Sequence, residues 1–285
     1  MACIVFLFTS FVLLVFVFRL FAYLVRWLEI SNRPDFQLPC RSPSAWLPAS
    51  LSAAQILALV MELASSFYMV VAWLIGFPKN FWLKSRKPCH SLLRKKESPV
   101  VVLVPGYLMN GTTLWVLSQR LKRDGFQVLV FEPGNIMHSI DRHARDLGDF
   151  VKAVVPRNGL LVLIGHSMGG LICRQYAARY AEDYTVTSII TLGTPHRGTM
   201  LWSLGIGAAA HDLRPGSTFL KQLNSLGSPE HPRQWVSLAS DFDELVIPNE
   251  YADFPGGEQL HVSLIGHFRL VLSAGVYRII RGYLP

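Results

Sequence analysis

The stretch LLVLIGHSMGGLICRQYAARY, residues 160–180, changes character halfway along its length. Residues 160–165 are an uninterrupted apolar run, which is typical of a strand buried on both faces of a sheet. The later residues have the apolar spacing of a helix. Between them lies Gly165-His166-Ser167-Met168-Gly169, so a serine flanked by glycines stands where the strand has to turn sharply into the helix.

The chain after Ser98 repeats this alternation of strand and helix patterns. Short apolar runs predict strands at residues 99–106, 126–133, 160–165, 186–193, 235–240 and 260–266. Helical spacing predicts helices at residues 112–124, 139–155, 167–181 and 267–283. Continuous apolar strands separated by helices indicate an α/β fold with a mostly parallel sheet that is covered by helices on both faces.

Ser167 is the candidate nucleophile. Gly165 and Gly169 lack the side chains that would clash in a tight turn, so the serine would lie in a strained conformation at the start of a helix. The N–H groups of that helix start could stabilise a developing oxyanion. A turn residue is the competing interpretation, because the motif alone is a weak signal and a serine needs a base to act as a nucleophile.

The base and its acid are expected after later strands, because sites in parallel sheets lie at the C-terminal strand ends. Among nine histidines, His267 follows the last predicted strand. The other histidines after Ser167 fit less well, because they lie inside a strand, beside prolines or too early: His196, His211, His231 and His261. Asp243 is the favoured acid, with Asp241 as its main rival and Glu244 also nearby.

An oxyanion hole needs two N–H donors. Met168, directly after the serine, supplies one. The second is expected in the loop after the first strand, where Pro105-Gly106 leaves the N–H of Tyr107 free. Leu108 is the alternative donor if the turn is shifted by one residue.

At this point the sequence resembles the α/β-hydrolase superfamily and, more narrowly, small bacterial triacylglycerol lipases and esterases. The stretches that carry the resemblance are VVLVPGYLMNGTTLW, LLVLIGHSMGGLICRQYA, IITLGTPHRGT, SLASDFDELVIP and VSLIGHFRLVLS, all between Pro99 and the C-terminus. The order Ser167, Asp243, His267 is that of the superfamily. The resemblance implies ester hydrolysis through an acyl-serine intermediate.

The chain departs from the lipase pattern at Pro105-Gly106, where many such lipases have His-Gly. That histidine is outside the triad, so the departure affects only the oxyanion assignment. The resemblance implies no cofactor and no metal for catalysis, and none of the four cysteines has metal-ligand spacing. Residues 200–217 form either a small apolar cap or a plain connecting loop.

Residues 1–97 are expected to be a membrane-anchoring region, and residues 98–285 a catalytic domain. Apolar stretches at about 2–27 and 51–77 are long enough to cross a bilayer. The first lacks the positive start of a cleaved signal peptide. The second contains Glu62, which would pair with the first helix, stay protonated, or belong to an amphipathic helix lying in the interface.

The net charge of +8 is explained by a basic linker at residues 79–97. Its position after an apolar stretch favours anionic lipid head groups over nucleic acid as its partner. The positive-inside rule then places the catalytic domain in the cytoplasm. The membrane is expected to be a bacterial inner membrane.

The expected protein is a membrane-anchored serine hydrolase acting on lipid or other acyl esters. An acyltransferase with the same triad and a non-catalytic membrane protein with this fold are the alternatives.

Overall fold

The computed structural model describes residues 13, 16–26, 28–29, 52–82, 99–156, 159–181, 185–226, 234–254 and 256–285, with backbone alone at 77–82 and 185. The predictions for His231, for most of the basic linker, and for Cys3, Cys40 and Cys89 fall outside these residues.

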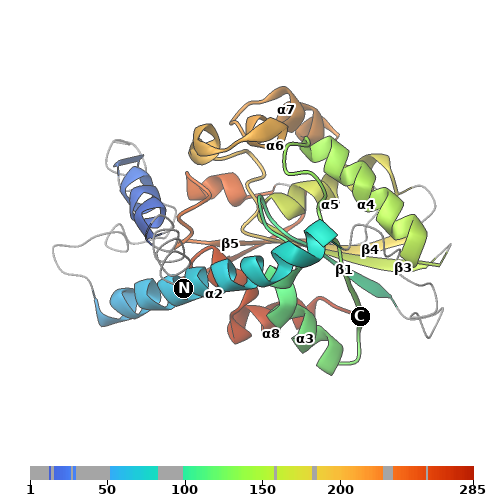
Figure 1. Ribbon diagram of the computed structural model, residues 1–285, viewed down its shortest axis with the longest axis horizontal. Helices are drawn as coiled ribbons and strands as arrows, with labels where there is room; N and C mark the ends of the chain where they lie inside the picture. Colours follow the sequence, from blue (N-terminus) through green and yellow to red (C-terminus); the bar gives the residue numbers. More distant parts are fainter. Residues whose placement is uncertain are drawn as a thin grey trace.

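The centre of the molecule is a six-stranded sheet in the order β2-β1-β3-β4-β5-β6 (Figure 1). Every neighbouring pair of strands is parallel. The strands are β1 (Val100–Val104), β2 (Gln127–Val130), β3 (Leu160–His166), β4 (Thr185–Leu192), β5 (Gln234–Ser240) and β6 (Glu258–Val262). The α/β fold with a parallel sheet that the sequence predicts is confirmed.

The apolar runs of the sequence are long because both faces of the sheet are covered. In β1, Val100, Val102 and Val104 point into one hydrophobic core, whereas Val101 and Leu103 point into a second core on the opposite face. Side chains alternate along a strand, so a strand between two helix layers has to be apolar at every position.

Helices form the two outer layers. α4 (Ile140–Val154) and α5 (Met168–Arg179) pack on one face, and α3 (Trp115–Arg123) and α8 (Ala274–Gly282) on the other (Figure 1). α4 begins where the sequence predicts, because Ser139 Oγ accepts the N–H of Arg142 at 3.2 Å. Two 3-10 helices, η3 (Gly111–Leu114) and η5 (Asn249–Ala252), complete the loops.

The last predicted helix, residues 267–283, is wrong as a single element. A short 3-10 helix, η6 (Phe268–Val271), comes first, and α8 begins separately. The break arises because Ser273 Oγ accepts the N–H of Val276 at 3.4 Å and so caps a new helix. The last strand also ends at Val262 rather than at residue 266, so His267 follows a short loop.

Residues 200–217 contain two short helices rather than a plain loop, and they are called the cap segment below. A 3-10 helix, η4 (Met200–Leu204), leads into α6 (Gly207–Asp212), and α7 (Thr218–Ser225) follows. The cap segment is tied to α4, because Asp212 Oδ2 accepts the N–H of Ile140 at 2.8 Å. Three of its apolar side chains, Met200, Leu204 and Ile206, are more than half exposed.

Two helical segments precede the sheet. The first covers residues 16–26 and 28–29, called here the N-terminal helical segment, and the second is α2 (Ala53–Trp82). In α2, residues Ala53–Gly76 are long and apolar enough to cross a membrane. Figure 1 shows α2 lying along the sheet domain, and the amide of Asn110 donates to the carbonyl of Trp73 at 2.9 Å.

The turn between β3 and α5 depends on two glycines. A Cβ at Gly165 would lie 2.5 Å from backbone atoms of Gly170, and one at Gly169 would lie 2.2 Å from the carbonyl oxygen of Val104. No side chain fits at such distances, so these glycines allow the helix to start directly against β1 and β3. Ser167 has the left-handed φ of 54° that the tight turn requires.

We expect Gly169→Ala to lower the free energy of unfolding by about 1–3 kcal/mol, because the new methyl group has to displace backbone atoms. Gly134→Ala is the matched control, since a Cβ at Gly134 would meet nothing within 4 Å. Urea unfolding of the detergent-solubilised chain measures both. Equal stability of the two variants would contradict the packing argument.

Candidate active site

The candidate catalytic residues all come after the carboxyl ends of strands, at one edge of the sheet. Ser167 follows β3, Asp243 follows β5, and His267 follows the short loop after β6. Because all strands are parallel, their carboxyl ends lie on the same side. The loop after β1, which carries Tyr107, reaches the same edge.

Ser167 is fixed through its backbone. Its N–H donates to the carbonyl of Leu192 at 2.8 Å, and its carbonyl accepts the hydroxyl of Thr194 at 2.9 Å and the N–H of Gly170 at 3.0 Å. The side chain is partly exposed, at the start of α5. The backbone is therefore rigid while the hydroxyl remains accessible.

His267 and Asp243 form a buried pair. The Nδ1 atom of His267 lies 2.6 Å from Oδ2 of Asp243, and each side chain is 1% exposed. The other carboxylate oxygen of Asp243 accepts the N–H groups of Leu245 at 2.8 Å and Val246 at 2.9 Å. The carboxylate is thus held by three hydrogen bonds, which fixes the orientation of the imidazole.

The environment of this pair shifts both pKa values. Burial alone would lower the pKa of His267, but the negative charge of Asp243 and its hydrogen bond outweigh burial, and the net pKa is raised above 6.5. For Asp243, burial alone would raise the pKa, but the charge and hydrogen bond of His267 and the two N–H donors lower it below 3.8. Asp243 is therefore ionised at neutral pH.

The backbone segment that binds Ser167 also borders this pair. A Cβ at Gly193 would lie 2.9 Å from Oδ2 of Asp243 and 3.2 Å from Nδ1 of His267, and Gly193 directly follows Leu192, the backbone partner of Ser167. Among the described residues, the hydroxyl of Ser167 makes no hydrogen bond to the His267 ring. Hydrogen bonds of this kind often tighten only when substrate binds.

His166, at the end of β3, contacts both the backbone and the ring of His267. Its Nε2 atom lies 3.1 Å from the carbonyl oxygen of His267, and the two ring centroids are 4.8 Å apart. Burial and the nearby His267 lower the pKa of His166 to about 3, so its ring is neutral and Nε2 donates the proton of this hydrogen bond. His166 was not predicted as part of the site, because a histidine inside a buried strand carries no distinctive signal.

The candidate oxyanion donors border Ser167. A Cβ at Gly106 would lie 2.9 Å from Cβ of Ser167, so the loop after β1 touches the serine. In the described part of the chain, the N–H groups of Tyr107, Leu108 and Met168 have no hydrogen-bond acceptor. Both alternatives for the second donor therefore stay open. The backbone of Leu108 has a left-handed φ of 56°.

Tyr107 also connects the site to the cap segment. Its hydroxyl donates to the carbonyl of Ile206 at 2.5 Å and accepts the N–H of the same residue at 2.6 Å. The cap segment is therefore held against the loop that carries a candidate oxyanion donor.

The other candidate groups lie in different surroundings. Asp241 accepts the hydroxyl of Ser263 at 3.1 Å and lies 4.0 Å from Nδ1 of His261, which is in β6 as expected. His196 is buried among Arg174, Thr191 and Ser237, at 3.1–3.2 Å from each. Burial lowers the pKa of His196 well below 6.5, so it is a neutral core residue.

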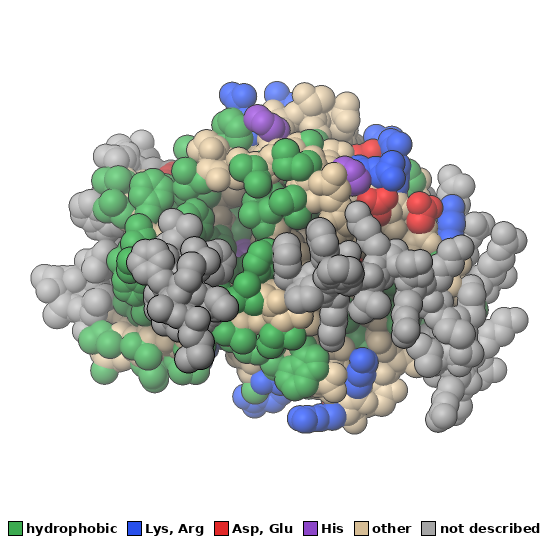
Figure 2. Space-filling view, viewed as in Figure 1, with side chains coloured by type: hydrophobic (Ala, Val, Ile, Leu, Met, Phe, Trp, Pro, Cys, Tyr) green, Lys and Arg blue, Asp and Glu red, His purple; other side chains and the backbone are tan. Residues whose placement is uncertain are grey.

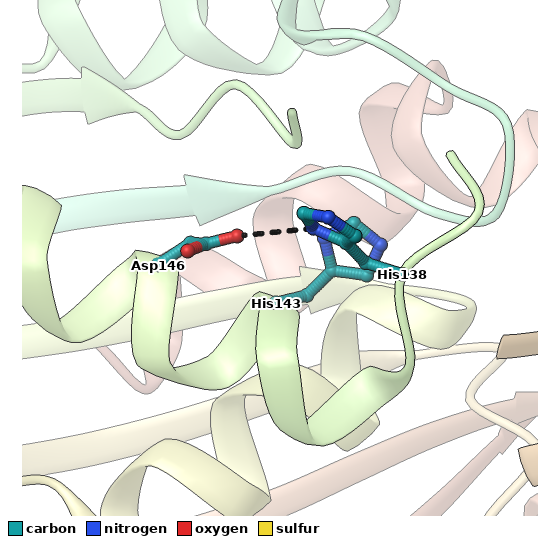
Figure 3. Close-up of side chains that lie close together, drawn as sticks. All are labelled: His138, His143 and Asp146. Atoms are coloured by element: carbon teal, nitrogen blue, oxygen red, sulfur yellow. Dashed lines mark ion pairs between the residues drawn. The ribbon is translucent and has the colours of Figure 1, made fainter. Parts of the chain in front are cut away.

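One group of side chains has metal-ligand character. Ligand atoms of His138, His143 and Asp146 at the start of α4 lie within 4.8 Å of one another (Figure 3). Tetrahedral zinc ligands lie roughly 3.3 Å apart, given zinc–ligand bonds of about 2.0–2.1 Å. The carboxylate of Asp146 is also bound by Nε of Arg142 at 3.0 Å. Nδ1 of His138 lies 3.6 Å from the same carboxylate, so ion pairing accounts for the approach of His138 to Asp146, whereas His143 is buried and makes no ion pair with them.

The fold also matches a known family. A family model described as the alpha/beta hydrolase fold matches residues 99–254, more than half of the chain. The chain therefore belongs to the alpha/beta hydrolase fold family.

Known proteins share this fold or part of the sequence. A carboxylesterase from Nitrososphaera gargenis has a TM-score of 0.52 at 15% identity, covering 67% of this chain and 91% of its own. The mature lipase of Bacillus licheniformis has a TM-score of 0.51 at 16% identity, covering 67% and 94%. A GPI inositol-deacylase of Candida albicans is 42% identical over 55 residues, which is 19% of this chain but only 14% of that protein.

We expect His267 to titrate above its ordinary pKa in the detergent-solubilised protein, as measured by NMR of histidine labelled with carbon-13. Asp243→Asn should lower this pKa, because burial then acts without the opposing negative charge. Asp241→Asn is the control and should leave the titration unchanged. A His267 pKa that does not respond to Asp243→Asn would show that another group raises it.

Proposed function

We propose that this protein is a serine hydrolase that cleaves carboxylic esters, with lipid or long acyl-chain esters as its substrates. The observation that carries the proposal is the buried pair of His267 and Asp243 beside a serine held at positive φ. A buried histidine with a raised pKa, oriented by an ionised carboxylate, is the arrangement that activates a serine.

In the proposed reaction, His267 Nε2 takes the proton of the Ser167 hydroxyl while Oγ attacks the ester carbonyl. The N–H groups of Met168 and Tyr107 stabilise the negative charge on the carbonyl oxygen. When the carbon–oxygen bond to the alcohol breaks, His267 gives its proton to the leaving alcohol. Water then attacks the acyl-serine with His267 as base, which releases the acid and restores Ser167.

The geometry supports Asp243 as the acid rather than Asp241. Asp243 is within hydrogen-bond distance of His267, whereas Asp241 bonds to Ser263 and lies beside His261. The role of Asp243 is to hold the tautomer of His267 with the proton on Nδ1 and to stabilise the imidazolium that forms.

The apolar surface supports a lipid substrate. Exposed hydrophobic side chains cover the outward sides of the N-terminal helical segment and α2, and Figure 2 shows hydrophobic side chains over the face on which α2 lies. Exposed apolar area of this kind marks a membrane or ligand surface. The relatives whose names mention lipase, carboxylesterase and inositol-deacylase activity act on esters, which fits this substrate class.

We further propose that residues 1–97 attach the enzyme to a membrane and residues 98–285 carry the chemistry. Because α2 lies along the domain, it could bind the membrane surface through its outward apolar face. This is consistent with the alternative that α2, which contains Glu62, is an amphipathic helix lying in the membrane interface. The cytoplasmic placement stays a prediction from the pattern of positive charges, and the bacterial inner membrane also stays a prediction.

The first test is labelling with a fluorophosphonate probe in detergent, which needs an activated serine. We expect the wild type to be labelled, and Ser167→Ala and His267→Ala to lose labelling while remaining folded. His261→Ala is the matched control, because this histidine lies in the neighbouring strand and should leave labelling intact. Labelling that persists in Ser167→Ala would refute the assignment of the nucleophile. Product analysis with a competing alcohol separates hydrolysis from acyl transfer.

A second test compares the two aspartates in hydrolysis of a p-nitrophenyl ester. Asp243→Asn should reduce kcat by about 10⁴-fold, the loss typical of a triad histidine in the wrong tautomer. Asp241→Asn should change kcat by less than about tenfold, since it removes no contact to His267. The opposite ranking would move the acid role to Asp241.

A further inference from the structure

The backbone next to His267 is held by two buried carboxylates outside the proposed triad. Oε2 of Glu244 accepts the N–H of His267 at 3.4 Å. Glu62, from the middle of α2, accepts the N–H groups of Phe268 at 3.0 Å and Arg269 at 3.3 Å. Three consecutive N–H groups at the start of η6 therefore depend on these two side chains.

Arg19 of the N-terminal helical segment joins the two carboxylates. Its guanidinium forms ion pairs with both Glu62 and Glu244, and all three side chains are 2% exposed or less. The guanidinium also lies 4.5 Å from the centre of the Phe268 ring. Arg19, Glu62 and Glu244 are called the buried charge cluster below.

The same helical segment also contacts the loop of the proposed acid. Arg26 is buried and donates hydrogen bonds to the backbone carbonyls of Asp243 and Asp241. Tyr23 donates to Oε2 of Glu244 at 3.3 Å. One helical segment thus reaches the loops of both His267 and Asp243.

Glu62 packs closely enough against the His267 loop to influence where that loop lies. A Cβ at Gly266, the residue before His267, would lie 2.2–2.4 Å from the carboxyl end of Glu62. The His267 loop therefore cannot move toward α2 without displacing Glu62. Loss of Glu62 would leave an opening beside the loop and two N–H groups without an acceptor.

Stability alone is a poor explanation for such a cluster. Buried ion pairs cost much desolvation free energy, and apolar residues of similar volume often stabilise a protein equally well. Yet the cluster contacts the backbone of His267, and its member Glu244 directly follows Asp243 in the chain.

We propose that Arg19 and Glu62 are positioning residues of the ester hydrolase, holding His267 in line with Asp243 and Ser167. The N-terminal helical segment and α2 are then part of the catalytic unit as well as its membrane attachment. This inference rests on the proposed function, because positioning has meaning only if His267 acts as the base.

The experiment measures hydrolysis of p-nitrophenyl butyrate and the rate of fluorophosphonate labelling, using the full chain in detergent. Glu62→Gln and Arg19→Met should reduce kcat by about 10- to 100-fold, because a small misplacement of the base is costly. KM should stay within about twofold, because neither residue contacts the substrate. Arg19→Lys should recover part of the loss, since it keeps the positive charge.

The matched control is Arg142→Met, which removes an arginine side chain that is 57% exposed and paired with Asp146 on α4. It should leave kcat and the labelling rate at wild-type values. Wild-type kcat in both Glu62→Gln and Arg19→Met, with Ser167→Ala inactive, would overturn the positioning role and leave the proposed function standing. A wild type that neither reacts with the probe nor cleaves the ester would overturn the proposed function and the positioning role together.

A triple variant removes the buried charges together. Arg19→Met, Glu62→Met and Glu244→Leu replace the buried charge cluster with apolar side chains of similar size, so that no buried charge is left without its partner. Because the N–H groups of His267, Phe268 and Arg269 lose their acceptors, we expect a melting temperature below that of the wild type, and a reduced kcat at temperatures where the variant is folded. Wild-type kcat in the folded triple variant would overturn the positioning role. If the variant does not fold, the comparison of Arg19→Lys with Arg19→Met decides.

Discussion

The backbone turn at Ser167 is the constraint on which the rest of the site depends. It holds a non-glycine residue at φ 54° between the central strand β3 and the buried helix α5. Such a conformation costs free energy and persists only when the surroundings enforce it. Here β4 supplies Leu192 and the loop after it supplies Thr194, and β1 lies so close that only glycine fits at position 169. The neighbouring elements therefore fix the serine from three sides.

Adjacent acids in the loop after β5 have different tasks. Asp243 contacts the ring of His267 and is held by backbone N–H groups, whereas Glu244 accepts the backbone N–H of His267 and pairs with Arg19 of the N-terminal helical segment. Consecutive residues point in different directions, so one short loop can serve the proposed chemistry and the attachment of the helices at once. Asp241, two residues earlier, faces the β6 side through Ser263. Direction rather than distance along the chain separates these three carboxylates.

The sequence predicts the sheet well because the causes are local. Continuous apolar runs mark strands buried on both faces, and Ser139 marks the start of α4 by its capping chemistry. The split of residues 267–283 was missed because Ser273 inside an apolar helical pattern looks like an ordinary helix residue. Glu62 was noticed as a charge in an apolar stretch, and its pairing with the first helix was among the expectations. Its contacts with Phe268 and Arg269 could not be predicted, because nothing in the local pattern connects residues so far apart in the chain.

That separation has a consequence for how the protein is made. Glu62 and the N–H group of Phe268 are 206 residues apart, whereas Ser167 and its strand lie near the middle of the chain. During synthesis Glu62 and the serine turn leave the ribosome before Phe268, the backbone partner of Glu62, emerges. Contacts between residues so far apart in the sequence form late, because the entropy cost of closing a large loop comes before the contact contributes any stabilising free energy. A nascent chain therefore carries the proposed nucleophile Ser167 before the His267 loop has emerged, and the proposed site is complete only after that loop has folded back onto α2.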